Sequence, residues 1–393
     1  MKTVKILVVA SVFPPHVGGL EKCAYQISTE LARRGNEVVV YTSNFPKSKP
    51  NEFKAGILIH RIPVFVKIFG VPAEPFLFHM LKEDIDLIHV HIPPIYGAIS
   101  SLMLAKIKHV PIVLTFHNDT FGKNAWQHLV ELVYKVVLNK VILKNVNIVT
   151  VPSQAYYAEL KHVGVERNKI RVIKNGITSY SPNEYDIEKM KQNFDFPGKK
   201  IVLFVGALEK RKGVEFLIRS FPMVKEKIPA TKLVIVGNGS ERTYLQNLAS
   251  TLGIEDDVSF VGRINDDELD FIYERSNVFV LPSMYESFGL VLLEAMSHRK
   301  PVVTTRIMGV TELVTAGFNG LLVEPRNAQQ LAEAIVKVLS EESYAIQLGK
   351  NGEQFSKKFE WKKIVTEYEN VYNESLKLER AGLNKTTTKN VTN

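Results

Sequence analysis

The sequence has 393 residues but only one cysteine, Cys23, and no long apolar run. A lone cysteine excludes a disulfide framework within the chain and argues against a structural zinc cluster. Because free cysteine is among the most buried residue types, we expect Cys23 to lie in a core rather than act as a reactive thiol. No stretch reaches about 18 uncharged apolar residues, so we expect no membrane-spanning segment and a cytoplasmic protein.

The charge is distributed unevenly along the chain. The net charge is +9, and the excess of Lys and Arg over Asp and Glu lies in residues 1–180. This asymmetry predicts that the N-terminal half meets an anionic partner, which could be a membrane surface, a phosphate-bearing acceptor or nucleic acid. A solvated basic surface is the alternative interpretation. We see no aromatic and basic clusters typical of nucleic-acid-binding modules, so we expect no nucleic-acid partner.

Apolar strand patterns alternate with amphipathic helix patterns in both halves of the chain. Such alternation is typical of doubly wound α/β units with parallel sheets. The fold class is therefore predicted as two Rossmann-like α/β domains facing across a cleft. We place the first domain at 1–176, a polar linker at 177–200 and the second domain at 201–360. A helix at about 361–380 is expected to pack back on the first domain, and the tail 381–393 is expected to be disordered.

Two turns of the second half have residues suited to phosphate. The turn 206–213 follows a strand and opens a helix, and it contains Arg211 and Lys212 beside flexible glycines. A helix N-terminus with nearby cations favours an anion. The turn 237–239, Gly-Asn-Gly, is of the tight kind that often borders a ligand crevice. A solvated basic turn and a turn that merely needs positive φ are the respective alternatives.

The segment 282–295 carries the strongest signal. A strand ends at Pro282, a loop holds Glu286 and Gly289, and the following helix contains Glu294. Amides at the start of that helix can hold a diphosphate, while the two acids can bind sugar hydroxyls. An acid on an otherwise apolar helix is costly without a partner, which favours a functional role for Glu294 over a solvated charge.

The N-terminal half offers weaker candidates. Gly18 and Gly19 join the first strand to the first helix, where a phosphate or acceptor could approach the backbone. His117 ends a strand at the expected crevice edge. We interpret His89 and His91 as packing residues.

Together these residues make the chain similar to glycosyltransferase family 4, the retaining enzymes of GT-B fold. The resemblance runs from about Lys5 to Leu378. It rests on an ordered set of positions: Gly18, Gly19, Glu21, 34–38, His117, Asn175, Gly176, Gly206, Lys212, Gly213, Gly237, Gly239, Glu286, Glu294, Gly309, Asn319 and Gly320.

The resemblance implies a role for each matching residue. Glu294 would bind the ribose of a nucleotide-sugar donor, Glu286 would face the transferred sugar, and Lys212 would neutralise the leaving diphosphate. His117 would contact the donor sugar. No metal or other cofactor is expected, because cationic side chains and helix termini take that role. The remaining donor-binding positions are Gly18, Gly19, Gly206, Arg211, Gly237, Gly239, Phe288, Gly289 and Leu290.

The expected function is retaining transfer of a hexosyl unit from a nucleotide-diphosphate sugar. The family commonly has Arg where this chain has Ala207, and Arg211 could compensate for the missing charge. A nucleotide-sugar epimerase of the same fold and an inactive scaffold are the alternatives. The acceptor is expected to be a glycan, lipid-linked at an anionic inner membrane face, because 65–82 and the helix near 126–144 combine apolar residues with lysines. Core packing with solvated lysines is the alternative for these segments.

Overall fold

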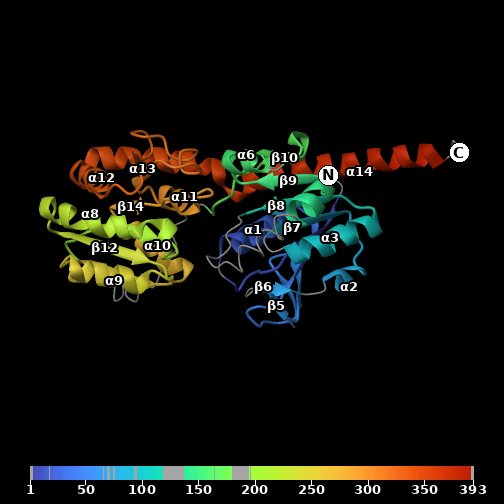
Figure 1. The fold of residues 1–393 in the computed structure, drawn as a ribbon, viewed down its shortest axis with the longest axis horizontal. Coiled ribbons are helices and arrows are strands. Elements are labelled where there is room, and N and C mark those ends of the chain that lie inside the picture. Colours follow the sequence, from blue (N-terminus) through green and yellow to red (C-terminus); the bar gives the residue numbers. More distant parts are fainter. Residues whose placement is uncertain are drawn as a thin grey trace. The chain divides into compact units, whose positions relative to one another are not determined.

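In the computed structural model of the protein, the apolar runs form the strands of two large sheets (Figure 1). The chain divides into a first unit, Met1–Asn175 with Trp361–Asn393, and a second unit, Gly176–Glu360. The structure describes residues 3–16, 18–64, 66–68, 71–73, 76–92, 95–117, 137–162, 164–178, 194 and 196–390.

The sheet of the first unit has eight strands in the order β10-β9-β8-β7-β1-β2-β4-β3. Every neighbouring pair is parallel except β3 and β4, which are antiparallel. A separate two-stranded sheet joins β5 and β6. The strands are β1 (Lys5–Ala10), β2 (Glu37–Ser43), β3 (Asn51–Lys54), β4 (Ile57–Ile62), β5 (Val66–Ile68), β6 (Val71–Ala73), β7 (Leu87–Ile92), β8 (Ile112–Phe116), β9 (Ile148–Val151) and β10 (Ile170–Val172).

Strand β1 shows how both faces of this sheet are buried. Ile6 and Val8 pack in a cluster with residues of α1 and α14, whereas Leu7 and Val9 pack in a second cluster with residues of α3 and α6. Side chains alternate across a strand, so a continuous apolar run suits a strand covered on both sides. The helical elements are α1 (Gly19–Arg33), α2 (Phe76–Met80), α3 (Ile95–Lys108), the π-helix η1 (Leu138–Ile142), α5 (Leu143–Asn145), α6 (Gln154–His162), η2 (Arg167–Lys169) and α14 (Trp361–Asn390).

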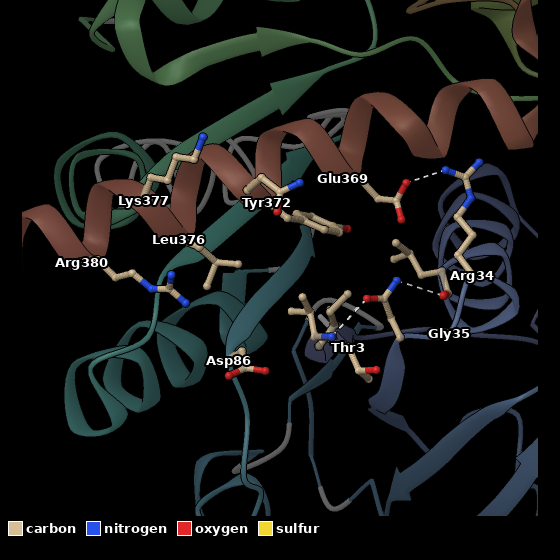
Figure 2. A pocket seen from close by; sticks show the side chains of 14 residues that line it. Thr3, Arg34, Gly35, Asp86, Glu369, Tyr372, Leu376, Lys377 and Arg380 are labelled. Atoms are coloured by element: carbon tan, nitrogen blue, oxygen red, sulfur yellow. Dashed lines mark hydrogen bonds and ion pairs between the residues drawn. The ribbon is translucent and has the colours of Figure 1, made fainter. Parts of the chain in front are cut away.

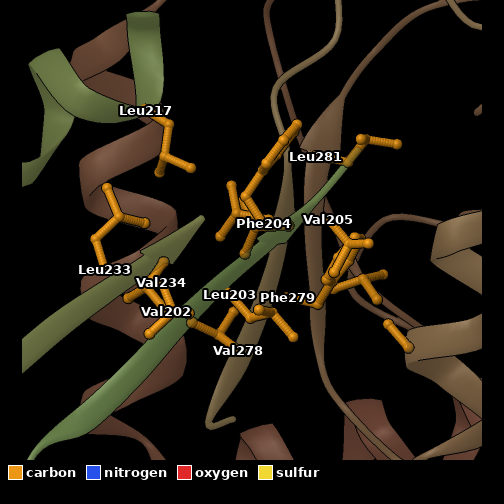
Figure 3. Close-up of a cluster of buried hydrophobic side chains, with 14 of the residues drawn as sticks. Val202, Leu203, Phe204, Val205, Leu217, Leu233, Val234, Val278, Phe279 and Leu281 are labelled. Carbon is orange, nitrogen blue, oxygen red and sulfur yellow. The ribbon is translucent and has the colours of Figure 1, made fainter. Parts of the chain in front are cut away.

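The second unit has a parallel sheet of six strands in the order β13-β12-β11-β14-β15-β16. Its centre is apolar on both faces, as the side chains of β11 and β14 show in Figure 3. The strands are β11 (Lys200–Val205), β12 (Thr231–Val236), β13 (Val258–Gly262), β14 (Val278–Leu281), β15 (Val302–Thr305) and β16 (Leu321–Val323). The helical elements are η3 (Lys210–Lys212), α8 (Val214–Lys227), α9 (Arg242–Thr251), η4 (Glu255–Asp257), α10 (Asp266–Arg275), α11 (Leu290–Ser297), α12 (Ala328–Ser340), α13 (Glu342–Ser356) and η5 (Lys357–Phe359).

Two details of the structure concern the expected linker and the expected tail. Ile177, at the start of the expected linker, and Phe194, within it, are apolar and are buried in the core of the second unit. Helix α14 continues to Asn390, which lies within the segment 381–393 that composition predicts to be disordered. Extending a helix whose first turns are packed costs little per added residue. Residues 391–393 lie outside the described part of the chain.

Candidate functional site

The two loops with the strongest sequence signals meet at one edge of the second sheet. The chain order of the strands reverses between β11 and β14, which are parallel neighbours. Ligands of open α/β sheets bind outside the carboxyl ends of the strands at such a reversal. The loop 206–213 follows β11 and the loop 282–289 follows β14, and the Met284 amide donates to the Arg211 carbonyl oxygen over 2.8 Å.

The loops bring Lys212 and Glu286 together in a nearly buried ion pair. Lys212 Nζ lies 2.5 Å from Glu286 Oε1, and the side chains are 12% and 5% exposed. Ser283 Oγ donates to the same carboxylate oxygen over 2.7 Å. Gly213 permits this approach, because its φ is +63° and a Cβ there would collide with the Pro282 carbonyl oxygen. Charged groups that are removed from water need partners of this kind. Here the loop after β11 supplies Lys212, and the loop after β14 supplies Glu286 and Ser283.

The N-terminus of α11 adds backbone amides beside this pair. Gly289 caps the helix with a φ of +84° and without a side-chain cap hydrogen bond. The first amides of any helix have no partner within the helix, and they favour an anion. Leu290 is the first residue of α11, and Phe288, just before the cap, is buried against Phe359 with ring centroids 6.0 Å apart.

Glu294 has a partner on another helix. It lies one turn into α11 and is half-buried. The hydroxyl of Tyr273, on α10, lies 3.5 Å from Glu294 Oε2 and 3.5 Å from the Val291 carbonyl oxygen. Burial, first, and then the Glu294 charge raise the pKa of Tyr273 well above its ordinary value, so its hydroxyl stays protonated. Tyr273 thus provides a contact for the Glu294 carboxylate on α11, the helix that directly follows the loop of Glu286.

The other donor-side candidates have structural explanations. Arg211 Nε pairs with Glu209 Oε2 at 2.7 Å, which gives its charge a partner within the same turn. Gly237 and Gly239 lie so close to the backbone of the loop after β11 that a Cβ would collide with the carbonyl oxygens of Gly206 and Leu208. These contacts bring the loops after β11 and β12 to the same sheet edge as Lys212.

The N-terminal candidates lie in the first unit. His117 follows β8, donates its backbone amide to the Ile92 carbonyl oxygen over 3.0 Å, and has its Nε2 2.9 Å from His91 Nδ1. Burial lowers the pKa of His117 to about 4, so its imidazole is neutral at pH 7. His89 and His91, both on β7, are fully buried.

The two glycines at the start of α1 differ in their surroundings. A Cβ on Gly18 would collide with the carboxylate of Glu21, whose Oε1 lies 2.7 Å from His16 Nδ1. At Gly19, by contrast, a Cβ would meet no described atom within 4 Å beyond its chain neighbours and the backbone of its own helix. Both glycines are exposed at the start of α1, and the end of the flexible Glu21 side chain is the obstacle that a Cβ on Gly18 would meet.

Several expectations about individual side chains are settled by burial. Cys23 is 1% exposed, which confirms it as a core residue, and burial raises the pKa of its thiol. Phe76 is fully buried and so is excluded from any surface within 65–82, while Phe78 is 75% exposed. Phe65 and Phe69 of the segment 65–82, and Lys135 of the expected helix near 126–144, lie outside the described residues.

A cavity of about 380 Å³ in the first unit is separate from these candidates (Figure 2). It lies beside α14 at the amino ends of β1 and β2, and its lining includes Asp86 and Arg380. Arg34 Nη1 pairs there with Glu369 Oε2 at 2.5 Å. Because ligands of such sheets bind at the opposite, carboxyl ends of the strands, we assign this cavity no part in the candidate site.

Sequence reasoning missed three residues that support Glu286 and Glu294, namely Ser283, Thr305 and Tyr273. Ser283 lies within the segment 282–295, and its hydroxyl, three residues before Glu286, could have been predicted as a hydrogen-bond donor to that carboxylate. Thr305, whose Oγ1 donates to the Ser283 carbonyl oxygen, and Tyr273 lie on elements distant in sequence, and no local pattern marks them. Among the described residues, no cluster of three or more His, Cys, Asp and Glu side chains is arranged to hold a metal ion. None of the described helices is long and apolar enough to span a membrane.

Two family models match the two halves of the chain. The model described as Glycosyltransferase Family 4 matches residues 17–179, and that of the Glycosyl transferases group 1 matches residues 186–355. An uncharacterized glycosyltransferase of Methanocaldococcus jannaschii is 30% identical, over 94% of this chain and 97% of its own. The chain therefore belongs to glycosyltransferase family 4 and is a glycosyltransferase.

Solved structures identify the fold as GT-B. Sucrose-phosphate synthase of Thermosynechococcus elongatus has a TM-score of 0.78 and 26% identity, covering 94% of this chain and 98% of its own. HepE of Anabaena, in complex with UDP and glucose, has a TM-score of 0.75 and 22% identity, covering 94% of this chain and 100% of its own. Each of the two units of this chain is one of the Rossmann-like domains of that fold.

Proposed function

We propose that the protein transfers a hexosyl unit, with retention at the anomeric carbon, from a nucleoside-diphosphate sugar to a glycan acceptor. The observation that carries this proposal is the Lys212–Glu286 pair at the strand reversal of the second sheet. A cation for a leaving diphosphate and a carboxylate for sugar hydroxyls are thereby placed beside a helix N-terminus.

The donor is held in the second unit according to this proposal. Lys212 neutralises the diphosphate together with the amides at the start of α11, and Glu286 accepts hydrogen bonds from the transferred sugar. Glu294, held near Tyr273, binds the ribose hydroxyls. Arg211 assists only after leaving Glu209. Cations and amides supply the charge stabilisation in this scheme, so no metal cofactor takes part.

Uridine diphosphate is the nucleotide we favour. The structure of HepE, which shares this fold, was solved in complex with UDP-glucose. The named curated relatives include D-inositol 3-phosphate glycosyltransferase and glycogen synthase, both transferases, so we do not favour the epimerase or the scaffold. His117 contributes a neutral imidazole to the donor sugar in our scheme.

A panel of nucleoside-diphosphate sugars tests the donor assignment. Binding to the folded state raises its stability by about 2.7 kcal/mol at a hundredfold excess over Kd. We expect one UDP-sugar to raise the Tm and to yield a product with the anomeric configuration of the donor, measured by NMR. Conversion of the donor to another nucleotide-sugar without acceptor would support the epimerase instead. Absence of stabilisation by every donor at millimolar concentration would contradict the proposal.

We also propose that the acceptor is lipid-linked and that the enzyme binds an anionic inner membrane face peripherally. The excess positive charge of residues 1–180 and the exposed Phe78 support this. Lys and Arg near an anionic surface each contribute about 1 kcal/mol of attraction, which salt screens. Sedimentation with phosphatidylglycerol vesicles at low salt, and release at high salt, is the expected result. If the protein does not bind these vesicles at low salt, the membrane proposal is refuted, whereas the donor assignment is unaffected.

A further inference from the structure

A second histidine lies directly behind His117. His91, on β7, places its Nδ1 2.9 Å from His117 Nε2. The two rings are nearly parallel, with centroids 5.2 Å apart and planes 19° apart, which suits a hydrogen bond between their edges. His91 is 1% exposed, so any effect it has on a substrate passes through His117.

The hydrogen bond between the two rings restricts where their protons lie. A neutral imidazole has one N–H and one lone pair, so one ring donates and the other accepts. His91 Nε2 is buried and has no hydrogen-bond partner among the described residues. If His91 Nδ1 donates, Nε2 carries only a lone pair. If Nδ1 accepts, Nε2 carries a buried N–H group that has no partner among the described residues. Buried N–H groups without a partner are the rarer case, so donation from His91 is favoured.

Donation from His91 determines the proton position on His117. Since His117 Nε2 then accepts, the single proton of its neutral ring lies on Nδ1. Burial lowers the pKa of both rings, that of His117 to about 4, which excludes the doubly protonated form near pH 7. His117 Nδ1 is also the one ring nitrogen that the bond to His91 leaves available.

We propose that His91 is a positioning residue that holds His117 as the Nδ1–H tautomer, ready to donate a hydrogen bond to a substrate oxygen. The substrate part of this inference rests on the proposed function. The tautomer part rests on the geometry of the two rings alone. Its role resembles that of outer-shell residues that orient a histidine by bonding its second nitrogen.

His89 provides a matched control on the same strand. It is as fully buried as His91, two residues earlier on β7. Its Nε2 lies 2.7 Å from Thr115 Oγ1 and its Nδ1 lies 2.8 Å from the Tyr372 hydroxyl, so both nitrogens are occupied away from His117. A change at His89 therefore perturbs the same core without removing the bond to His117.

The experiment combines nitrogen NMR of ¹⁵N-histidine-labelled full-length protein with kinetics of His91→Leu, His91→Asn and His89→Gln. We expect Nδ1–H at His117 in the unchanged protein, in His91→Asn, whose amide can still donate, and in His89→Gln. His91→Leu should show mixed tautomers, and its kcat should fall roughly 10–100-fold with KM nearly unchanged. His91→Asn should recover most of the lost turnover.

Two outcomes would overturn the proposal. One is Nε2–H at His117 in the unchanged protein, which decides the matter even if a variant fails to fold. The other is an unaltered His117 signal in folded His91→Leu. If the tautomers behave as expected but no donor is turned over, the proposed function fails and the positioning of His117 by His91 stands.

Discussion

The two units place different chemistry at the carboxyl ends of similar sheets. In the second unit, Lys212 and Glu286 form an ion pair with 2.5 Å between Nζ and Oε1. In the first unit, His117 and the histidines behind it are neutral because burial lowers their pKa values. The comparison teaches that two similar sheets can present an ion pair in one unit and neutral hydrogen-bonding imidazoles in the other.

Removing the cation should have the largest effect on the second unit. Lys212→Met leaves Glu286 buried without its partner, and breaking one side of a buried pair costs about 3–5 kcal/mol. Urea unfolding followed by circular dichroism should show this loss. Trp361 packs in the first unit, in the same apolar cluster as Ile6 and Val8, so its fluorescence should report a much smaller change. The double variant Lys212→Met with Glu286→Gln should regain part of the stability; equal loss in both would contradict a coupled pair.

Removing the loop carboxylate should have the largest effect on turnover. Glu286→Gln keeps the shape of the side chain but removes the charge that pairs with Lys212. We expect kcat to fall roughly 100–1,000-fold, the range seen when one electrostatic contact to the reacting group is lost. Ser283→Ala, which removes only a hydrogen bond to the same carboxylate, should lose far less. Normal turnover in Glu286→Gln would reject the assignment of this residue.

Removing the helix carboxylate should act on binding instead. Glu294→Ala deletes a charged hydrogen-bond acceptor whose contribution is about 1.5–3 kcal/mol, so donor KM should rise roughly 10–100-fold with kcat little changed. Tyr273→Phe leaves the carboxylate in place and is the matched control, with a smaller rise. A fall in kcat at unchanged KM would move Glu294 from the ribose to the reacting sugar.

Acid should destabilise the first unit through its buried histidines. Their folded pKa values lie below the unfolded value near 6.5, at about 4 for His117 and about 3 for His89. The unfolded state therefore binds more protons as pH falls below 6.5, and each such group removes about 1.4 kcal/mol of stability per pH unit until its folded pKa is reached. Tryptophan fluorescence during urea unfolding at pH 7, 6 and 5 measures this slope. His89→Gln should make the decrease of unfolding free energy with falling pH shallower. An unchanged pH dependence would show that the lowered pKa of His89 does not contribute to acid destabilisation.

Most of the fold was predictable because the strands and helices follow from local patterns of apolar and polar residues. Apolar runs at β1 and β11 indicated buried parallel strands, and the glycines before α1 and α11 indicated where helices begin. The exceptions are instructive. The short antiparallel strand β3 has no apolar face, so alternation could not reveal it. Composition predicted disorder for the tail 381–393, into which α14 extends as far as Asn390.

The sequence by itself determined the acids of the 282–295 segment, the basic turn 206–213 and the burial of Cys23, because each follows from residue type and near neighbours. Only the tertiary structure decided that Lys212 meets Glu286, that Tyr273 reaches Glu294 and that His91 bonds His117. The strand order sets which loops meet, and that order depends on pairings between distant segments. Local patterns therefore locate the chemical groups, while the packing of the sheets selects their partners.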